Sequence, residues 1–262
     1  MDTLDDVAKM PLLRIIQSGS PEVKKSHKDY PLKRIEGAEE GDILLASTGE
    51  IFKKLEIIPL AHVELYAEWR PKNIGGGFVQ HHPLSIVGDK DYKKGSARSD
   101  YDEFLGENEL IKTKYFAVLA RVDEEWKNAV LAFSSTGLKP GRQLNNMIKT
   151  FHYPDRNCYR WEQLGKGGKH EKFVAVDPMI YSRSFWLTTE AKSNDDGDWY
   201  NWHIEPGHTF ELSGENAQDD LATLELASTA QRAAVADLPE PEKRKALSDG
   251  SHTDVVADED PY

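Results

Sequence analysis

Alternating hydrophobic and polar residues mark the middle of the chain as β-rich. The stretches "GDILLAS", "EIFKKLEIIPL" and "AHVELYAEWR", which begin at Gly41, place apolar side chains at about every second position. A period of two is that of a half-buried strand. Further on, "KYFAVLARV" and "NAVLAFS" are two strongly apolar segments joined by "DEEWK", which predicts a hairpin. Residues 171–192 predict strand, bend and strand, and residues 198–206 predict a last strand.

Two other segments carry a helical pattern. After the hairpin, Leu144, Met147, Ile148 and Phe151 fall at helical spacing. Residues 216–236 are rich in alanine and leucine, which have high helix propensity. A small barrel or a sandwich fits this order of elements. The OB-fold, a five-stranded barrel with a helix between its third and fourth strands, is one specific option. We therefore predict a mainly β fold: an OB-fold-like barrel with an inserted helix, long loops, a C-terminal helix and a disordered acidic tail.

The pattern also divides the chain into segments. Residues 70–83, with Pro71 and three consecutive glycines, and the polar residues 88–108 predict long loops. The predicted segments are an irregular N-terminal part (1–40), a β-rich OB-like nucleic-acid-binding domain (41–212), a C-terminal helix (213–236) and a disordered acidic tail (237–262).

The net charge of -12 at first argues against a nucleic-acid partner. Its distribution changes that argument. From Ser213 to the end there are 12 acids and 4 bases, a net of -8, which leaves 33 acids and 29 bases, a net of -4, for residues 1–212. A block of like charge at a terminus is typical of a solvated interaction tail. The body of the chain is therefore nearly balanced.

Composition restricts the compartment and the chemistry. No apolar run approaches the roughly 20 residues of a membrane helix, and the N-terminus has no signal-peptide pattern. Cys158 is the single cysteine, which excludes an internal disulfide framework and a cysteine-based zinc site. We expect a cytoplasmic protein without membrane contact, located in the host cytoplasm if a phage encodes it.

Motifs for catalysis are missing or incomplete. The stretch "GKGGKH" at 165–170 lacks the spacing of a phosphate-binding loop. His81 and His82 are adjacent, so on a strand they would point to opposite faces, and a surface pair is the simpler interpretation. Glu64 and Glu68 would share one face of a predicted strand, which is typical of a solvated sheet face. We predict no enzymatic activity, no cofactor and no metal, and interpret Cys158 as a packed or incidental thiol.

Dense mixtures of basic and aromatic residues are the strongest functional signal. Single-stranded nucleic acid requires cations for its phosphates and aromatic faces on which exposed bases stack. The segment 149–172 holds six bases against three acids, together with four aromatic residues in a turn-rich part. Aromatic residues on strands are more often core, so the turn-rich part carries more weight. The predicted nucleic-acid-binding residues are Trp69, Arg70, Lys72, Arg142, Lys149, Tyr153, Arg156, Tyr159, Arg160, Trp161 and Lys169.

The end of the chain carries a resemblance. "ADEDPY" resembles the acidic tip of the single-stranded DNA-binding proteins of bacteria and their phages, which in bacteria is a run of aspartates, a proline and a final phenylalanine. Here a tyrosine replaces the phenylalanine. The resemblance implies an OB-fold core, no enzymatic activity, and docking to polymerases, helicases or recombination proteins. The residues that correspond to the docking tip are Asp258, Glu259, Asp260, Pro261 and Tyr262.

The rest of the chain, including "AEWRPKNIGGGFV" and "GDWYNWHIE", is similar in character to phage-encoded proteins of replication and recombination modules. Our leading hypothesis is a phage single-stranded DNA-binding protein that coats strands with little sequence preference. Two alternatives stay open. One is a structural or adaptor protein of a virion or its assembly, and the other is a metal-dependent nucleic-acid enzyme with Asp100 and Asp102 as metal ligands. A homodimer is compatible with the leading hypothesis.

Overall fold

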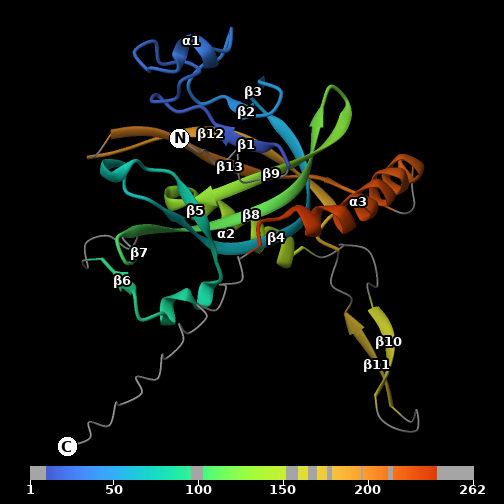
Figure 1. The fold of residues 1–262 in the computed structure, drawn as a ribbon. Coiled ribbons are helices and arrows are strands. Elements are labelled where there is room, and N and C mark those ends of the chain that lie inside the picture. Colours follow the sequence, from blue (N-terminus) through green and yellow to red (C-terminus); the bar gives the residue numbers. More distant parts are fainter. Residues whose placement is uncertain are drawn as a thin grey trace, which may run out of the picture.

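The computed structural model describes residues 10–95, 103–151, 159–164, 170–175, 179–195, 197–211 and 215–240. Its main feature is one large, mostly antiparallel sheet that curls into a half-barrel (Figure 1). The strands of this sheet are β1 (Leu12–Ile15), β2 (Ile43–Leu45), β3 (Glu50–Phe52), β4 (Leu55–Trp69), β5 (Phe78–His82), β6 (Tyr92–Lys94), β7 (Glu103–Leu105), β8 (Asn108–Val122), β9 (Glu125–Ser134), β12 (Arg183–Asn194) and β13 (Gly197–Thr209).

Helices and one separate hairpin complete the described structure. The helices are α1 (Tyr30–Lys33), α2 (Leu138–Lys149) and α3 (Ala217–Asp237), with short 3₁₀ turns at Lys72–Ile74, Leu84–Gly88 and Ser135–Gly137. Strands β10 (Tyr159–Leu164) and β11 (His170–Ala175) pair only with each other. The prediction of a mainly β fold with few helices is therefore confirmed. Among the described residues, no helix has both the length and the apolar character to cross a membrane.

Strand order in the sheet is β13-β12-β4-β8-β9-β1-β2-β3. The first five of these strands pair antiparallel with their neighbours, so β9, β4 and β13 run in the same direction. Strand β1 joins β9 in parallel through the pairs Leu12 with Val130 and Leu13 with Leu131. The N-terminal segment thus supplies a strand that lies next to the last strand of the β4-β8-β9 meander.

The concave side of the half-barrel holds the main core. Alternate residues of β8 and β9 point into it, among them Phe116, Leu131 and Phe133, which are at most 1% exposed. Helix α2 closes one end of this core with Leu144, which is fully buried, and the neighbouring side chains of Met147 and Ile148. The helix predicted from the spacing of these residues is confirmed, and it lies in the chain between β9 and β12.

The other face of the sheet is covered by α3. Tyr115, Ala117 and Leu119 of β8 pack there in a second core with Ala227 and Ala234 of the helix. The side-chain amide of Gln231 also donates a hydrogen bond of 2.7 Å to the carbonyl of Leu60, at a register shift in β4. The predicted C-terminal helix is confirmed, and its small alanines let it lie close against β4 and β8.

The hairpin between β8 and β9 is tighter than its sequence suggests. "DEEWK" was expected to be the connection, but β9 begins at Glu125 and only Asp123 and Glu124 form the turn. Both have positive φ, 49° and 64°. A two-residue hairpin turn whose twist matches that of its strands requires positive φ at both central residues. Asparagine and glycine usually occupy these positions.

Strands also occur where none were expected. Strand β1 lies before Gly41, β5 to β7 lie within the predicted loops of 70–83 and 88–108, and β10 lies in the turn-rich segment. Strand β11 falls where the first strand of residues 171–192 was predicted. Strands β1, β5 and β7 pair with longer strands of the sheet, and this pairing, rather than local pattern, explains them.

Candidate functional site

Two of the predicted binding residues stand at the end of β4. Trp69 is partly buried, and its ring meets that of Phe78 edge to face, with the ring centroids 5.6 Å apart. Arg70 is exposed directly after the strand, and the backbone of Lys72 lies in a 3₁₀ turn. Trp69 therefore has a packing role in the structure, whereas Arg70 is accessible.

Arg142 and Lys149 lie on α2 and form part of an exposed cationic stripe. With Lys139 they occupy one side of the helix, and α2 contains no acidic residue. Within the described part of the chain, none of these three cations forms an ion pair with an acid. They are therefore available to a phosphate group. We call Lys139, Arg142 and Lys149 the α2 stripe.

Several cations on and beside the sheet differ from the α2 stripe because acids neutralise them. Lys53 reaches Glu39 and Asp42 at 2.6 and 2.7 Å, and Arg121 reaches Glu56 and Glu124. Lys112, Lys114, Lys127 and Lys192 have carboxylate partners as well. Each of these ion pairs leaves little net charge at its own position.

The structure does not bring Arg70 to the α2 stripe. The charge of Lys149 acts on His62 of β4, whose pKa is lowered by burial first and then by Lys114 and Lys149. Trp69 lies seven residues further along the same strand. At about 3.3 Å per residue this is roughly 23 Å. The predicted binding residues therefore fall into at least two separate places.

The remaining predicted residues are described in part or not at all. Tyr159, Arg160 and Trp161 belong to β10, where Tyr159 pairs with Ala175 and Trp161 with Phe173 of β11. Outside the described residues lie Tyr153, Arg156, Lys169, the alternative metal ligands Asp100 and Asp102, Cys158, and the tip residues Asp258, Glu259, Asp260, Pro261 and Tyr262.

A buried polar cluster replaces the surface histidines expected at 81 and 82. Glu68 is 5% exposed and accepts hydrogen bonds from Asn108 at 2.5 Å and Gln80 at 3.2 Å, and its Oε2 lies 2.6 Å from Nε2 of His82. Both histidines are at most 5% exposed. The expectation of a solvated face at Glu68 and of surface histidines is wrong, because β5 pairs with β4 and covers them.

His81 is the other part of this buried region. Its Nε2 shares a hydrogen bond of 3.0 Å with the hydroxyl of Tyr115. Burial, and then the charge of His82, lowers the pKa of His81 to about 4. The hydrogen bonds of the cluster join β4, β5 and β8. No group of three or more metal-ligating side chains occurs among the described residues.

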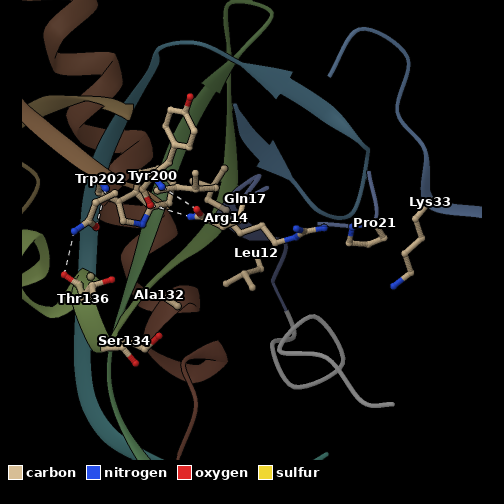
Figure 2. A pocket seen from close by; sticks show the side chains of 15 residues that line it. Leu12, Arg14, Gln17, Pro21, Lys33, Ala132, Ser134, Thr136, Tyr200 and Trp202 are labelled. Carbon is tan, nitrogen blue, oxygen red and sulfur yellow. Dashed lines mark hydrogen bonds between the residues drawn. The ribbon is translucent and has the colours of Figure 1, made fainter. Parts of the chain in front are cut away.

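The half-barrel has a seam between β1 and β13. The side chain of Gln17 bridges it: its amide nitrogen donates to the carbonyl of Tyr200 at 2.8 Å, and its oxygen accepts from the Tyr200 backbone N–H at 2.9 Å (Figure 2). These are the two hydrogen bonds that a strand residue would offer. The seam is thus closed on this side by a side chain instead of a backbone ladder.

Beyond this bridge the seam opens into a pocket of about 490 Å³. Leu12, Leu13 and Trp202 contribute apolar walls, and each is at most 5% exposed. Arg14 and Lys33 lie on one side, and hydroxyl residues at the end of β9 lie on the other (Figure 2). Among the residues that the structure describes, no acid lines this pocket. We call this the seam pocket. Its volume lies in the range of sites for small organic ligands.

The seam pocket and the basic segment beside it were not predicted from the sequence. Between Lys24 and Arg34 there are five bases, at 24, 25, 28, 33 and 34, against the single acid Asp29. This segment was interpreted as merely irregular. A count of charge in every short window would have found it, but nothing in the sequence places it beside β9 and β13.

The chain matches one protein-family model, described as Pam3 phage gp34-like protein, over residues 2–229. It belongs to this family. Membership in the Pam3 phage gp34-like family indicates a phage origin, as the sequence suggested. The matched range includes the seam pocket, the α2 stripe and more than half of α3, and stops before the acidic tail. Among curated proteins and among solved structures, nothing matches.

Proposed function

We propose that this Pam3 phage gp34-like protein binds single-stranded DNA through an OB-type barrel, coats it with little sequence preference, and serves phage replication or recombination. The observation that carries the proposal is the strand order. Five strands lie in the order β9-β8-β4-β12-β13, and α2 follows the third of them in the chain. Numbered along the chain, this is the order 3-2-1-4-5 with a helix between the third and fourth strands, as in an OB-fold.

One feature departs from a closed OB barrel. The third and fifth strands of the five, β9 and β13, run parallel but do not pair with each other. Strand β1 pairs with β9 in the space between them, and Gln17 links this segment to β13. The proposal therefore describes an OB-type barrel that is completed by an N-terminal strand.

The position of α3 changes which face of the barrel we expect to bind DNA. OB-folds commonly bind oligonucleotides over the outer face of their second and third strands. Here the corresponding residues Tyr115, Leu119 and Val130 are at most 2% exposed beneath the second core. We place the DNA at the end of β9 instead, where Lys33 of the seam pocket and the α2 stripe have no acidic partner among the described residues.

The positions of the cations support this placement of the DNA more strongly than any single aromatic residue does. The α2 stripe begins immediately after the residues that line the seam pocket, and the basic segment of residues 24–34 borders the pocket through Lys33. The cations thus lie on both sides of the seam pocket. In the chain α2 is followed by the segment that carries Tyr159, Arg160 and Trp161, to which we assign stacking and phosphate contacts.

The acidic tail completes the proposal as a partner-docking segment. A terminal aromatic side chain and its carboxylate suit a pocket with an apolar and a basic part. By the resemblance noted above, Asp258 to Tyr262 would recruit replication or recombination proteins. The same acids compete with DNA for the cations of the barrel, so deletion of residues 254–262 is expected to strengthen DNA binding.

The test compares a labelled oligo-dT with a duplex of equal length, using fluorescence anisotropy with the full chain. We expect oligo-dT to bind more tightly than duplex. The double variant Arg142→Glu, Lys149→Glu should weaken binding, whereas Lys93→Glu, which changes an exposed cation on β6, should not. No binding of oligo-dT up to about 10 µM protein at low salt overturns the proposal, because phosphate neutralisation is strongest there. Formation of large assemblies without DNA would then favour the structural alternative.

A further inference from the structure

We infer that the seam pocket receives one nucleotide of the bound strand, with the base against its apolar walls and the phosphate at its cationic rim. This inference rests on the proposed function and assigns it a specific subsite. The pocket exists because β1 pairs with β9 over only two residue pairs and meets β13 through the side chain of Gln17. A closed barrel would fill this space with backbone.

The chemistry of the walls matches that of a nucleotide. Ile15, Ala132 and Tyr200 line the pocket and are partly exposed, so their apolar atoms can exclude water from a base. Leu13 and Trp202, which are 1% and 5% exposed, add the neighbouring core to these walls. Ser134 and Thr136 present hydroxyl groups that can donate to phosphate or to base edges. Lys33 stands across the pocket from them (Figure 2). Apolar walls with a few convergent polar groups are characteristic of small-ligand sites.

The two cations at the rim differ in how firmly they are held. Arg14 is anchored, because its Nη2 lies 2.5 Å from Oε1 of Glu22, whose side chain is 4% exposed. This ion pair orients the guanidinium but offsets much of its charge. Lys33 is exposed and forms no ion pair with any acid among the described residues. Lys33 therefore supplies the net positive charge, and Arg14 supplies fixed donors.

The pocket also lies at the end of the proposed DNA path. Its hydroxyl side, Ser134 to Thr136, leads directly into Gly137 and then α2. A strand whose phosphates follow Lys139 and Arg142 along the helix therefore arrives at the pocket. A flexible single strand can turn one base inward there, whereas the bases of a duplex are held in their stack. The subsite thus gives a reason for single-strand preference.

The experiment is photochemical cross-linking of the full chain to an oligo-dT that carries one 5-iododeoxyuridine, followed by mass spectrometry of the linked peptide. We expect cross-links on the β13 peptide that contains Tyr200 and Trp202. Filling the pocket with Ser134→Phe should remove this cross-link and weaken binding of a short oligo-dT by about fivefold or more, the loss of one stacked base.

A variant that removes the charge of Lys33 tests the cationic rim of the seam pocket. Lys33→Ala should reduce the slope of log affinity against log salt by about 0.7, the loss of one phosphate contact on a single strand. Lys93→Ala, on β6, should leave the slope unchanged. Thermal unfolding of each variant verifies that it is folded.

The outcomes separate the two claims. If oligo-dT does not bind, the proposed function fails and this inference fails with it. If oligo-dT binds but all cross-links fall outside the pocket lining, the inference alone is overturned. The same holds if the Tyr200 and Trp202 peptide is cross-linked equally in Ser134→Phe. A cross-link there in the wild type that is lost in Ser134→Phe, together with the smaller salt slope of Lys33→Ala, supports the subsite.

Discussion

The side-chain amide of Gln17 makes both hydrogen bonds that the backbone of Tyr200 can offer, at 2.8 and 2.9 Å. The two residues are 183 positions apart in the chain. Through this contact the N-terminal segment is attached to β13, so one side chain does what a strand pair does elsewhere in the sheet. Strands β1 and β13 therefore share no backbone ladder at the seam, and the seam pocket opens there.

Replacement of Gln17 by alanine should destabilise the fold. The backbone N–H and C=O of Tyr200 would lose their partners, which costs about 1–3 kcal/mol for a buried group and less where water replaces the amide. Urea denaturation monitored by circular dichroism measures the change. Gln143→Ala, at an exposed position of α2, is the matched control and should change stability by less than about 0.5 kcal/mol. Equal stability of both variants would mean that the bridge does not hold the seam.

Gly141→Ala should also destabilise the protein, contrary to the usual effect in a helix. Alanine normally stabilises a helix interior by up to about 1 kcal/mol relative to glycine. Here the added Cβ would lie 2.8 Å from Cγ of the core residue Phe133. Overpacking of a core costs about 1–3 kcal/mol. Gly19→Ala, where the new Cβ meets nothing within 4 Å, should be nearly neutral in the same denaturation assay. A more stable Gly141→Ala would contradict the close packing of α2 on β9.

Glu68→Ala should be far more costly than removal of an exposed acid with the same geometry. Glu68 and His82 are 2.6 Å apart with side chains 6% and 4% exposed, whereas Glu39 and Lys53 are 2.6 Å apart with side chains 73% and 68% exposed. Breaking a buried pair costs about 3–5 kcal/mol, and breaking an exposed one costs less than about 1 kcal/mol. Calorimetric unfolding of Glu68→Ala and Glu39→Ala compares them. Similar losses would show that the cluster is accessible to water.

Stability should fall as the pH decreases from about 6.5 to about 4. Burial lowers the pKa of His81 from 6.5 to about 4, so in this range the unfolded chain binds a proton that the folded chain does not. The sign is therefore a loss of stability on acidification, which reaches at most about 3 kcal/mol for this group. His81→Gln should reduce this dependence in denaturation curves at several pH values, whereas His203→Gln, at an exposed position, should not. An unchanged slope in His81→Gln would assign the effect to other groups.

Local pattern identified the strands that contribute whole faces to the core. Strands β4, β8 and β9 contain long apolar segments, and α2 repeats its apolar residues at helical spacing, so their burial could be predicted from the sequence. Strand β1 could not, because its four residues are too few to show a period of two, and its position depends on pairing with β9. The same holds for β5, whose pairing with β4 buries His81 and His82.

The candidate site was predicted only in part, for a related reason. Arg142 and Lys149 could be identified because they stand in a basic segment and α2 exposes them. The seam pocket could not, because Lys33, Ser134 and Trp202 are far apart in sequence and meet only through the curl of the sheet.

The most direct test of the central claim is the affinity of the full chain for oligo-dT as a function of salt concentration. We predict binding below about 10 µM at low salt and a linear decrease of log affinity with log salt, with a slope of about -0.7 for each phosphate contacted. Such a slope should fall by about 1.4 when Arg142 and Lys149 are both replaced by alanine. Absence of binding at low salt, or binding that does not respond to salt, would contradict the account of a cationic path for single-stranded DNA.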